Sequence, residues 1–575
     1  MDPYYFLRWS GLILLGLLVY GQTFHFDFVF DDHLFIVTNP FIKNFNNFHV
    51  MWHAFPLTRL VGMYSFALNY HFNQLNPRGY HIFNFIVHLA AVGLVWALAD
   101  ILFTVIPAKA GIHTKDRLTR ELPFIIAVLF LVHPCQTQAV TYITQRFESM
   151  ATMFYLATMY FYLRARLSAG IAHKTIFFGL AGISTILGIL TKEVIITVPA
   201  MILASEWLLL NGDVYQLKII GRRHHLIGRR PLFIAIGGVL LYLLFSKLVH
   251  ANLSIFLGAI PSESHDGDVL TPARYFLTQM RVFLTFLRLL VLPIHQNLDY
   301  DYPASTGLFS PPLTLAGIGV ILGIVFFIIK LRRSSPLIAF GLAWVLITFS
   351  INLAPRSNVI FEHKLYLISF GFILAFVAAL SGWVRNRGTL LKILCCMIAV
   401  LAFISFQRNK VWANELMLWE DSIKKSPHKS RVNASLGRIY GSLGRYDESI
   451  DYLSRAIAIK PDNIDYENRG IIYAQQGRYD QALEDLDKSI AMDPDYFPPY
   501  VKRSWVYQTQ HHYKEALADL ARAIQLEPYF ADAYLERGML LMEIGRAQEA
   551  RNDFQQVLKI DPFNTQAAQY LKTLK

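Results

Sequence analysis

GRYDQALEDLDKSIAMDP (residues 477–494) is one of four stretches of the chain that align with one another. The others are GRYDESIDYLSRAIAIKP (444–461), HHYKEALADLARAIQLEP (511–528) and GRAQEARNDFQQVLKIDP (545–562), which gives periods of 33, 34 and 34 residues. A fixed period of this length is typical of repeat proteins in which each unit is one pair of helices. The last part of the chain is therefore predicted to be an array of helix pairs.

Small residues and prolines mark the same positions in each unit. The small residues of the first helices are Gly437, Gly470, Ser504 and Gly538, and a proline ends each second helix. Small side chains permit close helix packing, and proline cannot continue a helix. This is the tetratricopeptide pattern, an α-solenoid whose concave face binds peptides or partner proteins. NELMLWEDSIKKSP (414–427) fits the second helix of a degenerate leading repeat, so we expect a repeat domain over residues 407–575.

The remainder, residues 1–406, has the composition of a membrane protein. The whole chain is 54% hydrophobic and only 16% charged, against about 25% charged residues in soluble domains. Apolar segments of about 17–25 residues, long enough to cross a bilayer, recur along this part. We expect an all-α bundle of eleven spans, the first of them retained in the protein, near residues 8–24, 80–106, 123–141, 149–166, 175–191, 194–210, 231–250, 308–329, 336–353, 365–384 and 389–406.

The apolar stretch 273–293 is left out of this count. It carries Arg274, Arg281 and Arg288 at seven-residue intervals, near one helical face, which favours an amphipathic helix on the membrane surface or lining a cavity. With an N-terminus in the cytoplasm, eleven spans place the Lys- and Arg-rich loops inside, as is usual. The first outer loop (25–79), residues 251–307 and 354–364, and the repeats then lie on the outer side of the membrane.

Charge and cysteine content exclude several other classes of protein. Residues 1–406 hold 30 basic and 17 acidic residues, whereas residues 407–575 hold 23 and 24. A basic excess within a membrane region reflects orientation, so we expect no nucleic-acid partner. Cys135, Cys395 and Cys396 lack the spacing of metal ligands. We expect neither a cofactor nor a metal site, although adjacent carboxylates can hold a divalent ion.

Ionisable residues gather near the predicted outer ends of the spans, where such groups are costly and tend to be functional or paired. They are Asp27, Asp31, Asp32, His133, Arg146, Glu148, Lys192, Glu193, Asp299, Asp301, Glu362, His363 and Lys364. By the predicted topology these residues lie on one side of the membrane and can share one outward-facing pocket.

Each group also has a simpler interpretation. Asp31-Asp32 can cap a surface helix, because aspartate is a good N-cap residue. His133 can be a satisfied helix end, and Lys192-Glu193 can be the turn between two helices. Arg146 and Glu148 can anchor their helix at the interface or pair with each other, and NLDYDYP (297–303) can belong to an aromatic belt.

The pattern of acids and bases fits glycosyl transfer. This reaction needs a carboxylate base for the acceptor hydroxyl and cations for a departing phosphate. Two adjacent acids can take different roles when their surroundings push their pKa values apart. The phenylalanines around Asp31-Asp32 would exclude water and suit a long lipid chain that enters from the bilayer.

At the level of motifs the chain resembles the membrane protein O-mannosyltransferase-like group with tetratricopeptide tails, a branch of the polytopic (GT-C type) glycosyltransferases that use lipid-phosphate sugars. Seven stretches carry the resemblance, in the same order along nearly the whole chain: FDFVFDDHLFIVTNP (26–40), MYSFALNYHFNQLNPRGYHIFNFIVH (63–88), LFLVHPCQTQAVTYITQRFESMA (129–151), GILTKEVIITVPA (188–200), LPIHQNLDYDYP (292–303), NLAPRSNVIFEHKLYL (352–367) and ELMLWEDSIKKSP (415–427).

The resemblance implies a first outer loop, packed on the membrane surface, that carries the catalytic acid. By position the base is Asp31 or Asp32; Arg146, Lys192 and His363 would bind the donor phosphate. Glu148, Glu193, Glu362, Asp299, Asp301 and His133 would support the pocket. The chain departs from the family in having Arg59-Leu60 for Arg-Pro and Arg146-Phe147-Glu148 for Arg-Ala-Asp.

We therefore expect an inverting glycosyltransferase of the cell (inner) membrane, with its N-terminus in the cytoplasm. It would move a hexose such as mannose from a polyprenyl phosphate to Ser or Thr hydroxyls of an exported protein that the repeats present. Two alternatives stay open. One is an inactive, membrane-anchored repeat scaffold. The other is a transferase that acts on a lipid or glycan, or on pilin with an oligosaccharide donor.

Overall fold

The computed structural model describes residues 3–43, 55–105, 117–210, 262–263, 269–356 and 358–574. Helices make up nearly all of its regular structure, and β1 (Ser262–Glu263) and β2 (Val269–Leu270) form one two-residue antiparallel pair. The predicted all-α fold is confirmed. The chain divides into two compact units, Met1–Asp421 and Ser422–Lys575. This division falls inside α17, later than the predicted boundary at residue 406.

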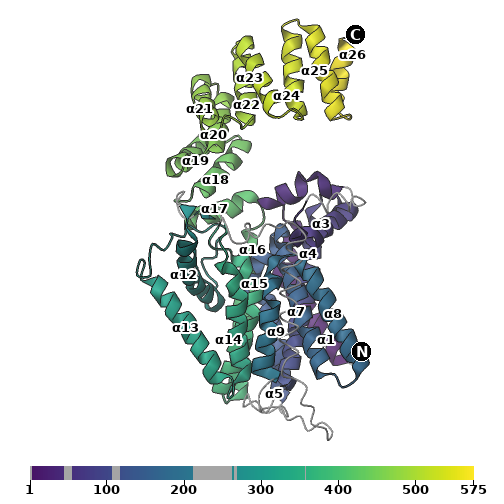
Figure 1. Ribbon diagram of the computed structural model, residues 1–575, viewed down its shortest axis with the longest axis vertical. Helices are drawn as coiled ribbons and strands as arrows, with labels where there is room; N and C mark the ends of the chain where they lie inside the picture. Colours follow the sequence, from purple (N-terminus) through teal and green to yellow (C-terminus); the bar gives the residue numbers. More distant parts are fainter. Residues whose placement is uncertain are drawn as a thin grey trace. The chain divides into compact units, whose positions relative to one another are not determined.

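The first unit is a bundle of long helices that run side by side (Figure 1). Its α-helices are α1 (Pro3–Tyr20), α3 (Leu60–Asn73), α4 (Pro77–Val105), α5 (Arg117–Val132), α6 (Thr137–Thr141), α7 (Arg146–Leu167), α8 (Ile171–Ile189), α9 (Val198–Ser205), α12 (Pro272–Val291), α13 (Leu313–Leu331), α14 (Pro336–Phe349), α15 (Leu365–Trp383), α16 (Arg387–Lys410) and α17 (Glu415–Lys425). Short helical turns link them: η1 (Gly21–His25), η2 (His33–Val37), η3 (Pro40–Lys43), η4 (Leu57–Arg59), η5 (Pro134–Gln136), η6 (Ile143–Gln145), η7 (Glu193–Thr197), η8 (Glu206–Leu210), η10 (Ser350–Leu353) and η11 (Glu362–Lys364).

Eight of the eleven predicted spans correspond to segments long and apolar enough to cross a membrane, among the residues that the structure describes. These segments are Tyr4–His25, Pro77–Phe103, Ile171–Ile189, Glu193–Leu210, Leu313–Leu331, Pro336–Leu353, Glu362–Trp383 and Arg387–Lys410. The predicted span 231–250 lies outside the described residues.

The other two predicted spans differ from expectation. The span 123–141 is broken: Arg120–Val132 and Pro134–Thr141 meet at a bend of 55°, since Pro134 cannot continue a helix. The span 149–166 is helical within α7, but its tyrosine, threonine and charged residues make it too polar to pass the same test. The number of spans that length and composition support in the described chain is thus eight, or nine with the bent pair.

Helix α12 covers the stretch 273–293 that was left out of the span count, and it is not among the candidate spans. Two of its arginines hold the loop that follows it. Arg281 donates to the Pro303 carbonyl at 2.9 Å, and Arg288 donates to the Ile294 carbonyl at 3.0 Å. Their regular spacing therefore serves to fasten residues 294–303 along one side of this helix.

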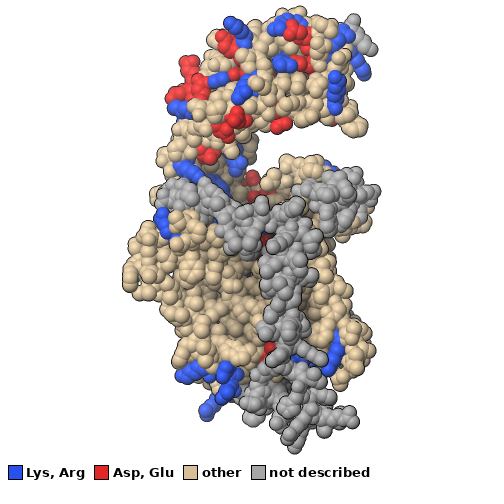
Figure 2. Space-filling view, viewed as in Figure 1, with Lys and Arg blue, Asp and Glu red and all other residues tan. Residues whose placement is uncertain are grey.

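The flanks of the bundle carry almost no charge on the face shown in Figure 2, and Lys and Arg gather at its lower end. Two contacts show which helix ends lie together at a basic end of the bundle. Arg166 in the last turn of α7 pairs with Glu206 of η8 at 2.6 Å, and Arg332 after α13 lies over the Trp207 ring of η8 at 5.3 Å. At the other ends of these helices, the loops between helices form a polar layer that holds most of the predicted site residues.

The second unit is a succession of helix pairs (Figure 1). The pairs are α18 (Ser430–Ser442) with α19 (Tyr446–Ile459), α20 (Asn463–Gln475) with α21 (Tyr479–Met492), α22 (Pro498–Thr509) with α23 (Tyr513–Leu526), and α24 (Ala531–Glu543) with α25 (Ala547–Ile560), followed by α26 (Thr565–Thr573). A methyl group on Gly437 would lie 2.6 Å from Leu453, and one on Gly538 would lie 2.7 Å from Phe554. The small residues thus permit the close packing within each pair, as predicted.

Candidate functional site

The acidic pair Asp31-Asp32 lies in the loop between η1 and η2. Asp32 is fully buried, and both of its carboxylate oxygens accept backbone hydrogen bonds, from Thr144 N–H at 2.8 Å and Val29 N–H at 3.1 Å. The Thr144 hydroxyl donates to the same carboxylate. Burial raises the pKa of the Asp32 carboxyl to about 7, although these hydrogen bonds oppose the shift. Asp32 therefore fastens this loop to η6. We call residues 26–32 the acidic loop.

Asp31 has different surroundings. It is only half-buried, and its N–H donates to the Tyr142 hydroxyl at 3.0 Å. Burial, and after it the Asp31 and Asp32 carboxylates, raise the pKa of Tyr142 well above its usual value. Tyr142 is therefore a hydroxyl that keeps its proton beside Asp31. The two neighbouring aspartates are thus distinct: one is enclosed, and the other is reachable from solvent.

Arg146 is fully buried, and protein groups satisfy its guanidinium. Nε donates to Asn84 at 2.6 Å, Nη1 to the Ser65 carbonyl and hydroxyl at 3.2 Å each, and Nη2 to the Tyr80 carbonyl at 3.0 Å. The rings of Phe66 and Phe83 flank it, with centroids 4.6 and 4.3 Å from its central carbon. This arginine joins α3, α4 and the start of α7.

Lys192 and Glu193 contribute to a buried group of charges. The Lys192 ammonium pairs with the Glu148 carboxylate at 2.9 Å, and burial lowers the pKa of this lysine. The Glu193 carboxylate pairs with Arg356 at 2.6 Å and with Arg59 at 3.9 Å. Four segments that are distant in sequence therefore meet here, and the turn at Lys192-Glu193 is part of an ion-pair network.

His363 and Lys364 of η11 belong to the same neighbourhood. Both are buried, and both interact electrostatically with Lys192 and Arg356. Lys364 also lies 5.5 Å from the centre of the Phe361 ring. We call Arg59, Lys192, Arg356 and Lys364, together with Glu148 and Glu193, the cation cluster. It contains four basic side chains and two carboxylates, so its net charge is about +2 when all six are ionised.

Polar atoms without hydrogen-bond partners lie beside the cation cluster. Among the described residues, the Tyr275 hydroxyl, His363 Nδ1 and both amide atoms of Asn352 are buried and have no partner. Tyr275 interacts electrostatically with Arg356, and η10, which carries Asn352, packs against α12 and η7. Most buried polar groups in proteins are hydrogen-bonded. Such a concentration of unsatisfied groups beside excess positive charge is a feature of polar binding sites.

Glu362 lies apart from the cation cluster, in a second hydrogen-bond network. Its carboxylate accepts Asn297 N–H at 2.6 Å and Gln296 Nε2 at 3.0 Å, and it also accepts the Tyr300 hydroxyl. Burial and the Glu362 charge raise the pKa of Tyr300 well above its usual value. Asp299 is buried in the same loop, where its carbonyl accepts Asn297 Nδ2 at 3.0 Å, and Asp301 is half-buried. Glu362 therefore holds residues 296–300 in place.

His133 caps a helical turn. Its Nδ1 accepts the Cys135 N–H at 3.2 Å, and its Nε2 lies 3.1 Å from the Leu290 carbonyl at the end of α12. Both ring nitrogens are thus engaged by protein groups. Of its two interpretations, the satisfied helix end describes this geometry. Among the described residues, no group of three or more His, Cys, Asp or Glu side chains lies together in a way that could hold a metal ion.

Two contributors to the cation cluster, Arg59 and Arg356, were absent from the predicted site, and a third, Lys364, was expected near the pocket but was given no role there. Each lies in a stretch that drew attention for another reason. Arg59 marked a departure from the family pattern, and Arg356 and Lys364 lie in NLAPRSNVIFEHKLYL. The available signal was the position of these cations in short loops between apolar spans. These cations come together only in the folded chain, and their spacing in the sequence does not predict this.

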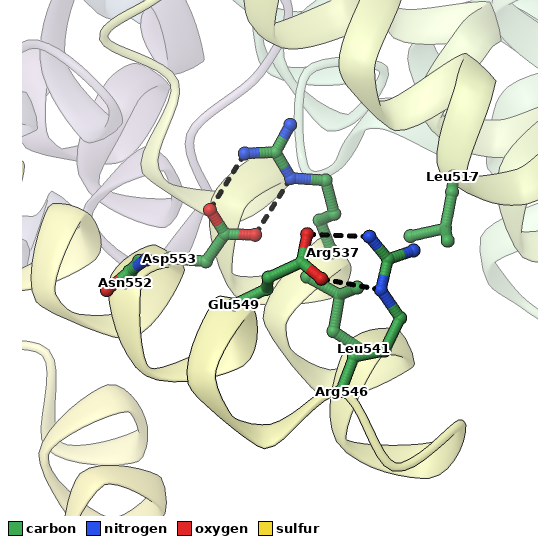
Figure 3. A pocket seen from close by; sticks show the side chains of 7 residues that line it. All are labelled: Leu517, Arg537, Leu541, Arg546, Glu549, Asn552 and Asp553. Atoms are coloured by element: carbon green, nitrogen blue, oxygen red, sulfur yellow. Dashed lines mark hydrogen bonds and ion pairs between the residues drawn. The ribbon is translucent and has the colours of Figure 1, made fainter.

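The repeat unit has its own surface pocket of about 340 Å³ between α23, α24 and α25. Figure 3 shows that its charged residues face one another: Arg537 forms two hydrogen bonds with Asp553, and Arg546 forms two with Glu549. Each charge that lines the pocket is neutralised by another. This pocket therefore lacks the excess charge that distinguishes the cation cluster.

Fold and site together define a polytopic helical protein with a partly buried cation cluster and a C-terminal repeat array. Tetratricopeptide repeat models match residues 437–477, 466–496 and 505–574, which confirms the predicted repeats. Among solved structures, MamA is 21% identical with a TM-score of 0.24, and the alignment covers 26% of this chain and 86% of that one.

The curated relatives are more extensive matches. The chain is 25% identical over 478 residues to Protein O-mannosyl-transferase F38B6.6 of Caenorhabditis elegans, which covers 78% of this chain and 62% of the relative. It is 24% identical over 464 residues to Protein O-mannosyl-transferase Tmtc3 of Drosophila melanogaster, with 71% and 48% covered. For Protein O-mannosyl-transferase TMTC1 of Homo sapiens the values are 24% over 518 residues, with 77% and 54% covered.

These similarities confirm the resemblance inferred from the motifs. The chain spans between about half and three-fifths of the length of these curated relatives.

Proposed function

We propose that this protein is a membrane glycosyltransferase that moves a hexose, such as mannose, from a polyprenyl phosphate to Ser or Thr hydroxyls of a polypeptide. The relatives named protein O-mannosyl-transferases support the transfer of sugar to protein. The observation that carries the donor class is the cation cluster, where four cations share two carboxylates. Lys192 and Lys364 are buried, and the two arginines are partly exposed. Excess buried charge is unfavourable unless a ligand of opposite charge compensates it.

The donor phosphate would occupy the cation cluster. Arg356 and Lys192 each keep a carboxylate partner, while Lys364 sits among like charges that a phosphate would balance. Arginine and lysine also stabilise the charge that develops on a departing phosphate. The unsatisfied groups of Tyr275, Asn352 and His363 would then bind sugar hydroxyls. We assign Arg146 a structural role, because protein acceptors already surround its guanidinium.

Asp31 is our choice for the base. It is half-buried, whereas both oxygens of Asp32 are engaged in the interior. In the proposed step, Asp31 takes the proton of the acceptor hydroxyl while the hydroxyl oxygen attacks the anomeric carbon from the face opposite the phosphate. The bond between this carbon and the phosphate oxygen breaks, and the electron pair leaves with the polyprenyl phosphate. The sugar is therefore transferred with inversion of configuration.

Orientation follows from the distribution of basic residues. Cytoplasmic ends of membrane helices are rich in Lys and Arg, so the end with Arg166, Arg332 and Arg333 would be cytoplasmic. The acidic loop and the cation cluster would then face the outer side. The C-terminal end of α16 also lies beside η1, which leads into the acidic loop, since Gln22 donates to the Phe406 carbonyl at 2.7 Å. The chain would thus leave the membrane on the outer side, where the repeats would bind the acceptor polypeptide.

The test is transfer by the purified full-length protein in lipid nanodiscs, from radiolabelled mannosyl polyprenyl phosphate to Ser- and Thr-containing peptides. We expect label on hydroxyl side chains, and a decrease in kcat of about 10²–10⁴-fold for Asp31→Asn, since this is the usual contribution of a general base. Label on lipid or glycan alone would overturn the protein acceptor. Wild-type turnover by Asp31→Asn would overturn the proposed base.

Absence of transfer from every hexosyl polyprenyl phosphate offered would favour a repeat scaffold. To separate an inactive preparation from an inactive protein, binding of the unlabelled lipid phosphate is measured in the same nanodiscs. A protein that binds neither the lipid phosphate nor its sugar conjugate would contradict the role given to the cation cluster.

A further inference from the structure

Residues 406–419, which run from the end of α16 into α17, lie along the acidic loop of the first unit. We call this stretch the clamp. Besides the contact between Gln22 and Phe406, the Ala413 carbonyl accepts Asp27 N–H at 3.1 Å. The Glu415 carboxylate accepts Phe30 N–H at 2.8 Å. The clamp therefore contacts η1 once and the loop after it twice, and the last of these contacts is next to Asp31.

Aromatic rings reinforce the clamp. The Trp419 ring packs edge-on against Phe30, with centroids 5.3 Å apart, and Trp412 stacks on Tyr142 at 5.3 Å. Trp412 and Trp419 are among the most deeply buried side chains of the protein. Because Tyr142 contacts Asp31 directly, the clamp supports Asp31 from two sides: through Phe30 and through Tyr142.

The backbone of Phe30 shows why support is needed. Its φ is 51°, in the left-handed region that residues with a side chain seldom occupy. A conformation of this kind persists only where surrounding contacts impose it, and such positions are common at active sites. Contacts on Phe30 from outside its own loop include the Glu415 hydrogen bond, the Trp419 ring and the more distant Tyr142 ring. The next residue along the chain is Asp31, so this backbone turn sets the direction of its carboxylate.

We propose that Glu415 and Trp419 are positioning residues for the acidic loop. This inference rests on the proposed function for its catalytic consequence, since Asp31 is the base only under that proposal. The geometry extends further. Glu415 and Trp419 are in α17, whose last residues belong to the second unit, so one helix carries both the clamp and the start of the repeat unit. A movement of α17 would therefore reach Asp31 through one hydrogen bond and one ring contact.

The test compares four variants of the full-length protein: Glu415→Ala, Glu415→Gln, Phe30→Ala and Phe30→Gly. Glu415→Ala removes the acceptor for Phe30 N–H, and we expect kcat to fall about 10- to 100-fold, as for a small misplacement of a catalytic group. KM for the donor should change little, because the cation cluster is separate from the clamp. Glu415→Gln keeps an oxygen that can accept the same hydrogen bond, so we expect it to retain activity within about threefold of wild type.

The Phe30 pair separates the ring from the backbone. Both variants lose the contact with Trp419, but glycine adopts a positive φ without strain, whereas alanine does not. We expect Phe30→Gly to be more active than Phe30→Ala. Met417→Ala is the matched control, because Met417 is exposed on the same helix, and it should behave as wild type.

A second measurement is independent of catalysis. Hydrogen–deuterium exchange of residues 26–35 in the full-length protein should be faster in Glu415→Ala and unchanged in Glu415→Gln. Wild-type exchange and wild-type kcat in Glu415→Ala would overturn the positioning role. If the exchange changes as expected while the wild type transfers no sugar, the clamp stands and the proposed function fails.

Discussion

Buried charges follow one rule in the repeat unit and another in the membrane bundle. In the repeats, Arg469 pairs with Asp485, Arg503 with Asp519 and Arg537 with Asp553, each through two hydrogen bonds and each 16 residues apart in sequence. We call these three pairs the arginine ladder. In the cation cluster, by contrast, four cations share two carboxylates, and no period relates them.

Under the proposed function, this difference separates a structural use of charge in the repeats from a functional use in the cation cluster. Each pair of the arginine ladder is neutral and joins the two helices of its own repeat, so it recurs with the 34-residue period of the fold. The cation cluster has excess charge, draws on four separate segments and lies beside unsatisfied polar groups. A structural pair is complete in the free protein, whereas the cluster would be completed by an anion.

Lys364→Met tests most directly whether the cation cluster differs in role from the arginine ladder. Lys364 has like charges as its strongest electrostatic neighbours, so its loss should relieve repulsion and leave the thermal midpoint unchanged or higher. If it holds the donor phosphate, kcat/KM for the lipid donor should fall about 10²–10³-fold, in the range seen when one charge-stabilising group is removed. Sugar transfer and thermal unfolding are measured on the same nanodisc preparation.

A matched change in the arginine ladder is Arg503→Met, which should lower the thermal midpoint and leave the transfer rate intact. The functional role of the cluster would be contradicted if Lys364→Met destabilised the protein and transferred sugar normally. Lys364 would then be one more structural cation.

The second prediction concerns the arginine ladder and compares adjacent residues. Asp485→Ala leaves the largely buried Arg469 without its carboxylate, and we expect a loss of about 2–3 kcal/mol in the stability of the repeat unit. Glu484→Ala removes an exposed partner of Lys488, and we expect a much smaller loss of stability, because solvent screens this pair. Native-state hydrogen exchange of α20 and α21 in the full-length protein measures both. Equal effects of the two variants would show that burial does not set the value of these pairs.

The sequence predicted the repeats better than the site, and the reason is physical. The 34-residue period is written in the chain, because every unit must bury the same face against its neighbours. Partners across the bundle carry no such period. Arg146 was expected to hold phosphate, yet Asn84, Ser65 and Tyr80 already accept its hydrogen bonds. The sequence shows where a charged residue lies along the chain. Whether its partner is a ligand or another part of the protein depends on the fold.

The bent span over residues 123–141 is a second case in which the sequence predicted the segment but not its geometry. Hydropathy predicted one continuous span over 123–141, and the structure bends it by 55°. The proline was visible in HPCQ (133–136), but the length of the apolar run outweighed it. The bend places Gln138 where its side chain accepts the His363 N–H at 2.6 Å. The polar residues after Pro134 thus join the layer that contains the site.

The third prediction uses pH to test the buried member of the acidic pair. The pKa of Asp32 is about 7 in the folded protein, against about 4 in the unfolded chain. Because the folded value is the higher one, the contribution of this carboxyl to stability is complete below pH 4 and is lost as the pH rises towards 7. Between pH 6 and 8 the loss should amount to about 1 kcal/mol.

The measurement for this third prediction is the difference in thermal midpoint between wild type and Asp32→Asn at pH 6 and pH 8. Asparagine does not titrate, so the variant should gain relative to wild type as the pH rises, whatever constant cost the substitution has. The double difference cancels groups that titrate equally in both proteins. Parallel pH profiles would show that Asp32 does not titrate between pH 6 and 8, and a pKa of about 7 for this carboxyl would then be wrong.

The smallest expected effect lies in the turn of the third repeat. The turns of the other three repeats contain Gly444, Gly477 and Gly545 with φ of 74–79°, whereas His511 occupies the matching position with φ of 60°. His511→Gly should stabilise the repeat unit by about 0.5 kcal/mol, since glycine adopts this conformation without strain but loses chain entropy on folding. The substitution also removes the hydrogen bond between His511 and Tyr513, which is exposed and contributes little.

Gly477→Ala is the converse change and should destabilise by a similar amount. Hydrogen exchange in α22 and α23 reports the first variant, and exchange in α20 and α21 reports the second. If His511→Gly were destabilising, contacts of the histidine side chain would outweigh the backbone strain at this position. This turn would then differ from the three glycine turns that recur with the 34-residue period.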